Sequence, residues 1–200
     1  TDFQVLEFTG TRFQTFNVPK VISSGFEFEG TIRPTNGLTF TTSLAYTDAR
    51  YPDDCAAVTD ALALRNLCGN SLTNAPKFVA IMGANYEIPI TDSIDIFFNG
   101  QARIESDRRT SAQARATPAT AAQLGLTPLN PFDVQDGTTK INLRAGLKQS
   151  DGAWAIEAWV TNLTDQVTRG VTFNTALRSG SRSAFPQEPR MFGLTLRGKF

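Results

Sequence analysis

The chain ends "EPRMFGLTLRGKF" (residues 188–200), and this stretch alternates strictly between two kinds of side chain. Counting back from the end, every second residue is apolar or glycine: Phe200, Gly198, Leu196, Leu194 and Phe192. The positions between them include Arg197 and Lys199. A period of two predicts a β-strand with one apolar and one polar face. Such a strand fits a soluble sandwich, and it fits equally well a barrel in lipid, whose apolar face points outward.

Composition limits the classes of function. The 200 residues suffice for one sizeable domain. Lys plus Arg and Asp plus Glu balance at 19 each, so no nucleic-acid partner is predicted. Histidine is absent, which excludes histidine acid–base catalysis and histidine metal ligands within this chain. No phosphate-binding loop or catalytic triad is found, so the chain is predicted not to be an enzyme and to bind no cofactor.

Two cysteines, Cys55 and Cys68, bracket a polar, turn-rich stretch. A metal site would need more ligands nearby, and a catalytic cysteine would need a histidine. A disulfide that clamps one exposed loop is therefore the favoured interpretation, which implies an oxidising compartment outside the cytosol.

Eight strands are predicted, each near the length that a tilted membrane strand needs. They span residues 2–8, 21–33, 38–48, 77–88, 93–105, 138–149, 153–161 and 190–200. Tight turns alternate without exception with long connections at 10–19, 49–76, 106–137 and 162–189. In an up-and-down meander, this alternation puts every tight turn at one end of the sheet and every long loop at the other. A Greek-key sandwich has no reason to sort its loops in this way.

Side-chain parity predicts the register of two hairpins. A two-residue turn at 151–152 pairs like faces and sets Glu157 diagonally between Arg144 and Lys148. The hairpin around the Asn-Gly turn matches its apolar residues only if the loop contains an odd number of residues. We therefore expect Gly37 to adopt the left-handed conformation of a bulged turn.

Aromatic residues occupy two levels of the predicted sheet. Near the tight turns lie Tyr86, Trp154 and Phe200, whereas Tyr46 and Phe78 lie near the long loops. Two aromatic levels are typical of a barrel in a bilayer. The small residues between them would underfill a soluble core, but they cost little against fluid lipid. The pattern favours a membrane barrel over a soluble sandwich.

Four stretches resemble TonB-dependent outer-membrane receptors. "EPRMFGLTLRGKF" is similar to the terminal strand of that family, in which a Pro-Arg pair precedes an alternating strand that ends on Phe. "AIEAWVTNLTDQ" (155–166) resembles the strand that is followed by Asn-Leu and an acidic or amide residue. The hairpin "VISSGFEFEGTIRPTNGLTFTTSLAYTDARY" (21–51) and the strand "NAPKFVAIMGANYEIP" (74–89) resemble the family's preceding elements. Each motif is weak alone, but their order and spacing are specific and cover nearly the whole chain.

The resemblance implies an all-β, antiparallel, up-and-down transmembrane barrel of about 22 strands, of which residues 1–200 form the carboxy-terminal segment. The plug domain, the earlier strands and the region that engages TonB are not visible in this sequence. The implied location is the outer membrane of a Gram-negative bacterium, with periplasmic tight turns and carboxy terminus and extracellular long loops. The implied function is TonB-driven import of a scarce ligand: a ferric siderophore, cobalamin, haem or a saccharide.

Partners follow from the same resemblance: membrane lipid, the imported ligand, TonB through a missing amino-terminal region, and the barrel assembly machinery. The resemblance assigns an assembly signal to alternate residues of the last strand: Phe192, Leu194, Leu196 and Phe200.

Six residues in the long loops are candidates for ligand contact: Tyr51, Asp53, Asp54, Arg108, Arg109 and Arg115. The carboxylates could bind a cation or a sugar hydroxyl, and the arginines could attract an anionic ligand. Simple solvent exposure is the competing interpretation of all six.

Two alternative functions remain open from the sequence. A self-contained eight-stranded barrel would serve as an outer-membrane anchor or adhesin, with its interior filled by side chains. A soluble carbohydrate-binding sandwich would use Trp154, Trp159 and Phe28 to stack sugar rings.

Overall fold

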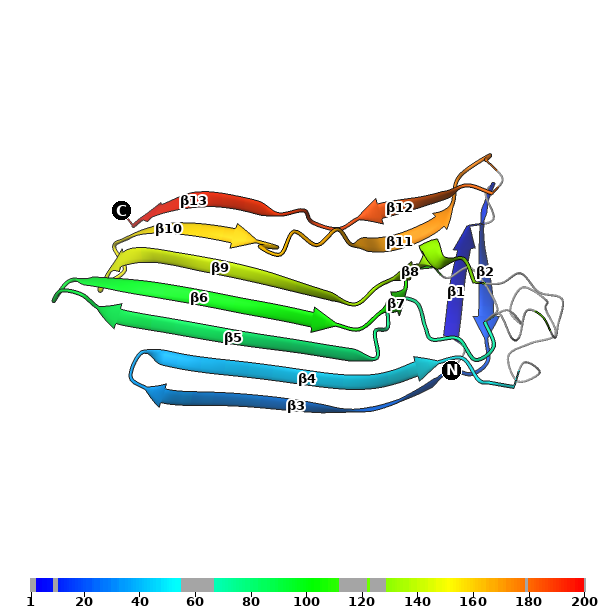
Figure 1. Cartoon of the computed structure of the whole chain (residues 1–200), viewed down its shortest axis with the longest axis horizontal. Helices are drawn as coiled ribbons and strands as arrows, with labels where there is room; N and C mark the ends of the chain where they lie inside the picture. Colours follow the sequence, from blue (N-terminus) through cyan, green and yellow to red (C-terminus); the bar gives the residue numbers. More distant parts are fainter. Residues whose placement is uncertain are drawn as a thin grey trace.

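The computed structural model describes residues 3–8, 11–54, 67–111, 122, 129–178 and 180–199. The chain is all-β and is built around one seven-stranded antiparallel sheet (Figure 1). The strands of this sheet lie side by side in the order in which they occur along the chain. The sheet is therefore an up-and-down meander, as predicted. The strands are β3 (Ile22–Thr35), β4 (Leu38–Arg50), β5 (Phe78–Pro89), β6 (Ile94–Glu105), β9 (Thr138–Gln149), β10 (Trp154–Thr161) and β13 (Met191–Gly198).

The prediction of an eighth strand in this sheet is wrong. Instead, β1 (Phe3–Phe8) pairs with β2 (Phe13–Val18) in a separate hairpin beside the long loops (Figure 1). Alternation predicts that residues 3–8 form a strand, but it does not specify the strand's partner. Two further two-stranded sheets lie within the long connections. They are β7 (Arg108–Arg109) with β8 (Val134–Gln135), and β11 (Arg169–Asn174) with β12 (Arg182–Pro186).

The two ends of the sheet differ as the sequence predicts. All three tight turns lie at one end, which we call the turn end, and β13 also finishes there (Figure 1). The long connections lie at the opposite end, the loop end. There β1, β2, β7, β8, β11, β12 and the short 3-10 helix η2 (Pro131–Asp133) form what we call the loop layer.

The registers of the two hairpins confirm the parity argument. In β9–β10, Gly146 lies opposite Glu157. In β3–β4, the register shifts after Ile32, so the extra residue is a bulge in β3 just before the turn. Gly37 has a φ of +80°, as predicted. A Cβ at Gly37 would lie 2.1 Å from the carbonyl oxygen of Glu87, so the turn needs glycine for space as well as for conformation.

One face of the sheet carries its large apolar side chains and leaves them exposed. We call it the apolar face. The exposed residues run from β3 to β13 and include Phe26, Phe28, Ile32, Phe40, Met82, Leu143, Ile156, Phe192, Leu194 and Leu196. No second sheet covers this face in the described part of the chain. The apolar face therefore does not fit the sandwich alternative, whose core would be covered.

The aromatic levels are present on the apolar face. Near the loop end, Phe26 stacks on Tyr46 with ring centroids 5.7 Å apart, and Tyr46 lies opposite Phe78. Near the turn end, Tyr86 lies opposite Phe98. The levels are eight positions apart along β5, about 26 Å of extended chain, and a strand tilt of about 40° would reduce this to about 20 Å across the membrane, slightly less than an apolar band of about 25 Å. Phe200, predicted at the turn-end level, lies outside the described residues.

The buried apolar cluster lies at the loop end rather than within the sheet. It consists of Val5, Val18, Tyr51 and Leu67, with Phe16, Val21 and Leu72 packed against it. Within the ranges that the structure describes, no helix is long and apolar enough to cross a membrane.

Candidate functional site: the polar face and its loop-end pocket

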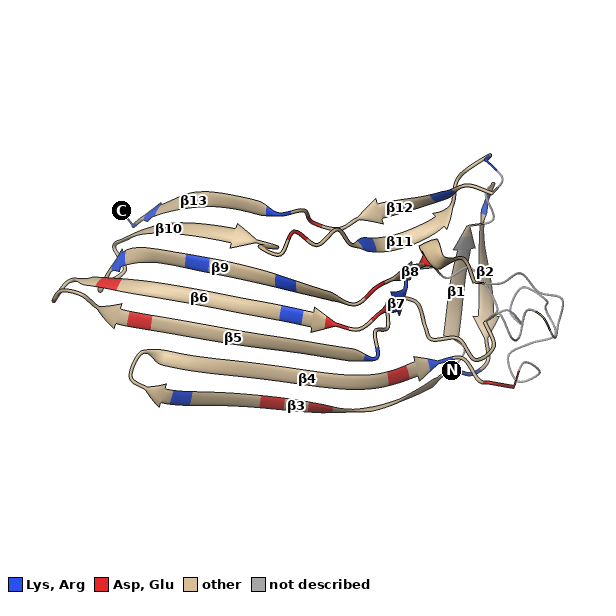
Figure 2. Cartoon of the chain, in the orientation of Figure 1, with Lys and Arg blue, Asp and Glu red and all other residues tan. Residues whose placement is uncertain are grey.

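The face opposite the apolar face carries most of the sheet's charged and amide side chains, and we call it the polar face. Basic residues recur every fourth position along β9, at Lys140, Arg144 and Lys148 (Figure 2). A spacing of four keeps them all on one side of a strand. Acidic residues, drawn in red, lie on β3 and on the turn-end parts of β5 and β6 (Figure 2). The hollows along this face include a loop-end pocket, a central hollow and a turn-end pocket.

The loop-end pocket has a volume of about 820 Å³ and is lined by three basic residues, Arg103, Arg108 and Lys140. Glu105 and Glu188 also line it, so the charges of its lining sum to +1. Glu105 is shared between two arginines: its Oε1 lies 2.8 Å from Arg108 Nη1, and its Oε2 lies 3.1 Å from Arg103 Nη2. Arg103 is 45% exposed. Its guanidinium therefore remains within reach of a molecule in the pocket.

Arg108, a predicted ligand contact, is buried and joins several segments. Its Nε donates to Asn74 Oδ1 at 3.3 Å. Its Nη2 lies 3.3 Å from the carbonyl oxygen of Arg169 and 3.4 Å from Gln187 Oε1. Together with Glu105, these acceptors come from four separate parts of the chain. Arg108 thus holds the pocket wall in place, because a guanidinium offers five donors in a fixed plane.

A buried polar network lies beneath this wall. Asp133 is fully buried and its Oδ1 pairs with Arg182. The same oxygen accepts a hydrogen bond from Thr172 Oγ1 at 2.7 Å, and Thr172 Oγ1 lies 2.9 Å from Thr110 Oγ1. The network joins η2, β11, β12 and the segment after β7. Buried polar contacts therefore hold these four segments together.

Two further predicted contacts, Tyr51 and Arg109, are also buried. Tyr51 belongs to the apolar cluster, where burial raises the pKa of its phenol to about 12. Burial also lowers the pKa of the Arg109 guanidinium. Arg109 lines a smaller pocket of about 270 Å³ together with Asp48, Arg50 and Lys77.

The remaining candidates are placed differently. Asp53 and Asp54 are exposed, and Asp53 pairs with Arg50. Arg115 and Cys55 lie outside the described residues. Cys68 is buried, with its Sγ 2.9 Å from the carbonyl oxygen of Asp53. The disulfide therefore stays a prediction, as does ligand contact by all six residues.

A central hollow of about 290 Å³ lies midway along the sheet. Its lining is rich in amides, and Asn99 Nδ2 donates to Asn85 Oδ1 at 2.8 Å. Arg144 and Trp159 complete one side of it. Uncharged amides alternate here as donors and acceptors, so this part of the polar face can hydrogen-bond polar groups of either kind.

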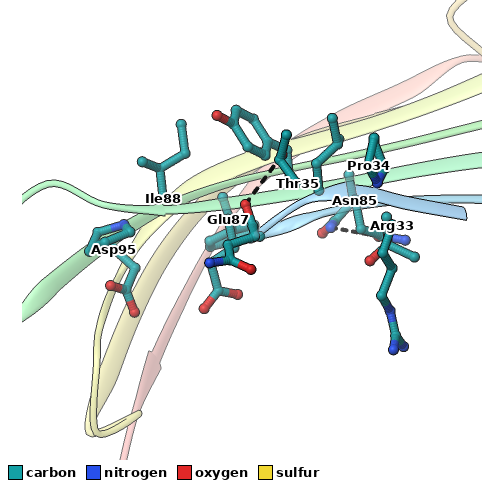
Figure 3. Close-up of a pocket in the computed structure, with 15 residues that line it drawn as sticks. Arg33, Pro34, Thr35, Asn85, Glu87, Ile88 and Asp95 are labelled. Carbon is teal, nitrogen blue, oxygen red and sulfur yellow. Dashed lines mark hydrogen bonds between the residues drawn. The ribbon is translucent and has the colours of Figure 1, made fainter.

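The turn-end pocket, of about 800 Å³, lies beside the β3–β4 turn (Figure 3). Glu87, Asp95 and Arg33 point to one side of the sheet, and Ile88 points to the other (Figure 3). Glu87 Oε2 lies 2.7 Å from Lys148 Nζ. The register sets Glu157 diagonally between Arg144 and Lys148, as predicted, but Lys148 makes its ion pair with Glu87 on β5. Arg197 of β13 takes its place beside Glu157, with its Nη2 2.9 Å from Glu157 Oε1.

Sequence reasoning missed Asp133, Lys140 and Gln187. Asn130-Pro131 is a turn signal just before Asp133, but a turn signal does not predict burial. Lys140 was recognisable only as one of a series with Arg144 on one strand face. In the described ranges, no group of three or more Cys, Asp or Glu side chains is arranged to hold a metal ion.

Comparisons with known proteins identify the family. Residues 1–163 match the family model described as TonB dependent receptor-like, beta-barrel. No curated protein matches the chain. Among solved structures, the chain is similar to the ferric yersiniabactin uptake receptor FyuA from Yersinia pestis, with a TM-score of 0.71 and 16% identity over 94% of this chain. It is also similar to BauA, the ferric preacinetobactin receptor from Acinetobacter baumannii, with a TM-score of 0.60 and 13% identity over 98% of this chain.

The chain spans 25% of the length of each of these solved structures. At this identity they show the fold, while the family model matches most of the chain's length. The meander, the exposed apolar face and the sorted loops are those of a barrel wall. This chain belongs to the TonB-dependent receptor-like β-barrel family.

Proposed function

We propose that the chain is the carboxy-terminal wall segment of a TonB-dependent receptor that imports a scarce ligand across the outer membrane. The observation that carries this proposal is the two-faced sheet. An exposed apolar face suits lipid, and the opposite face carries charges and hollows that suit an aqueous interior. The tight turns would face the periplasm, and the loop layer would face the outside. TonB would engage a part of the receptor that precedes this segment.

The sheet supports a segment of a larger barrel over a self-contained anchor. Within the described residues, the edge strands β3 and β13 do not pair with each other. With β1 in the loop layer, seven strands remain, and eight is about the smallest number that closes around packed side chains. A larger barrel would pair both edges with strands that precede this segment.

The loop-end pocket supports an anionic ligand such as a ferric chelate. Its lining carries a net positive charge, and Arg103 and Lys140 are available from the sheet. Buried Arg108 adds charge without moving, because its bonds fix it. Cobalamin and neutral saccharides would gain less from such a lining, since they do not need a cation. The segment performs no covalent chemistry in this proposal.

The proposal is tested with the full-length gene in its host. Cells are starved of iron and supplied with radioactive iron as ferric chelates of different charge. We expect uptake of one anionic chelate to depend on the receptor and on TonB. Arg103→Gln should weaken that uptake, whereas Arg190→Gln, at a guanidinium of similar exposure, should not. If deletion of the receptor left the uptake of every chelate unchanged, iron import would be excluded.

The intact mass of the native polypeptide tests separately whether this chain is a segment of a longer receptor. We expect the outer membrane to contain a species several times heavier than 21.8 kDa. A native mass of 21.8 kDa would contradict the receptor proposal and favour a small anchor barrel.

A further inference from the structure

On the polar face of β9, β10 and β13, two arginines share one glutamate. Glu157 of β10 is only 3% exposed. Its Oε1 accepts from Arg197 Nη2 at 2.9 Å and lies 3.4 Å from Arg144 Nη1. The two arginines approach from the strands on either side, β9 and β13. Both guanidiniums therefore converge on one carboxylate oxygen.

Two aromatic rings on the polar face explain why Glu157 is buried although it faces the barrel interior. Gly146 lies opposite Glu157 on β9, and a Cβ there would come within 2.9 Å of the Phe97 ring. On the other side, a Cβ at Gly193 would lie 2.6 Å from the Trp159 ring. The indole of Trp159 is fixed, because its Nε1 donates to Thr195 Oγ1 at 3.1 Å. Water is thus kept from Glu157, which strengthens its ion pairs.

The charges of this cluster do not cancel. Two guanidiniums face one carboxylate, so the cluster has a net charge of +1. Arg144 is 46% exposed and Arg197 is 62% exposed, and in the described part of the chain each makes an ion pair only to Glu157. Asp95, a nearby acid, lies three strands away from Arg197, about 14 Å across the sheet. Several donors of each guanidinium are consequently open to the interior.

We propose that Arg144 and Arg197 form a carboxylate-binding site on the interior wall of the barrel. Arg144 also lines the central hollow, which gives the carboxylate a way in. Two planar guanidiniums suit a carboxylate because each presents parallel N–H groups to its oxygens. The carboxylate comes either from an acidic side chain of another part of the receptor or from a free molecule inside the barrel. This proposal requires the polar face to be the barrel interior, and it does not depend on which ligand is imported.

Arginine-specific labelling of the full-length receptor tests the site. The detergent-solubilised receptor is treated with phenylglyoxal, and mass spectrometry measures the adducts at Arg144 and Arg197. Arg190 is the internal control, because it is 47% exposed and pairs one-to-one with Asp165 at 3.1 Å. Succinate is the probe, compared with sodium chloride at the same ionic strength, because salt alone screens exposed charges.

Concentration-dependent protection of both arginines by succinate, with Arg190 unaffected, would support binding of a free carboxylate. The Arg197→Lys variant should then need about tenfold more succinate to protect Arg144, because lysine keeps the charge and loses the parallel donors. The matched Arg190→Lys variant should leave that concentration unchanged.

Both arginines could instead be protected before succinate is added. A structure of the full receptor then decides the source. A carboxylate of the receptor within hydrogen-bonding distance of both guanidiniums would support the proposal, whereas cover by uncharged groups would overturn it. Labelling at the rate of Arg190, with and without succinate, would also overturn it.

Discussion

The seven-stranded sheet and the loop layer differ in where their large apolar side chains lie. In the sheet, large apolar residues such as Leu194 and Phe26 are exposed, and a charged residue, Glu157, is buried. In the loop layer, apolar Val5 and Val18 are buried, together with the Asp133 network. The apolar cluster of the loop layer is withdrawn from its surroundings, whereas the apolar face of the sheet is turned toward them. The apolar face of the sheet therefore suits lipid, whereas a loop layer with a buried apolar cluster suits water.

The substitution with the largest expected effect destabilises the loop layer and leaves the sheet intact. Asp133→Ala leaves Arg182 buried without its carboxylate, which should destabilise the loop layer by about 3–5 kcal/mol. Hydrogen exchange of the full receptor should show lost protection at Thr110 and Thr172, with the sheet unchanged. Asp136→Ala removes an exposed carboxylate nearby and serves as the control. Equal protection in both variants would show that the network does not hold the layer together.

A matched pair of substitutions tests the surroundings of each region. Leu143→Arg places a charge in the middle of the apolar face, which should cost about 2–4 kcal/mol in a bilayer. Leu177→Arg changes a loop residue that is 89% exposed, and it should cost almost nothing. The measurement is the unfolding free energy of the full receptor in lipid vesicles. Similar values for the two variants would contradict the contrast between lipid and water.

A smaller effect is expected on the polar face of the sheet. Trp159→Phe keeps a ring near Gly193 but removes the hydrogen bond to Thr195, at a cost of about 1 kcal/mol. Trp154→Phe changes the other tryptophan, which lies on the apolar face. We expect the thermal midpoint of the detergent-solubilised receptor to fall further for Trp159→Phe. The reverse order would mean that the indole hydrogen bond does not fix the ring.

The smallest effect is a titration in the loop layer. The pKa of Tyr51 is raised to about 12, above its unfolded value, because burial disfavours the phenolate. The folded state then binds more protons than the unfolded state between these two pKa values. The contribution of the protonated Tyr51 phenol to folding stability is complete below the pKa of the unfolded state and is lost as pH rises toward about 12. The difference in phenolate absorbance between the receptor and its Tyr51→Phe variant should therefore appear late in an alkaline titration. Titration of Tyr51 at the ordinary pKa of a tyrosine phenol would instead show that its side chain is exposed to solvent.

Sequence patterns predicted the sheet far better than the loop layer. The strand order, the sorted turns and the conformation of Gly37 follow from periodicity and short-range turn chemistry, which are local properties. The partner of β1 and the burial of Arg108 depend on residues far apart in the chain. Arg108 bonds Gln187, 79 positions away, and no periodic signal connects them. Arg108 and Arg109 resemble exposed loop arginines in sequence because their acceptors are visible only once the loops are folded.

The sorting of tight turns and long loops also bears on how the sheet forms. Three pairs of strands, β3–β4, β5–β6 and β9–β10, are joined by tight turns, so each pair can close before the chain has searched widely. The last pairing, β10 with β13, must span the connection between Thr161 and Met191. The hairpin β11–β12 folds within that connection and shortens the flexible chain that has to be closed. We therefore expect the three hairpins to form early, and the pairings across the long connections, β4–β5, β6–β9 and β10–β13, to follow.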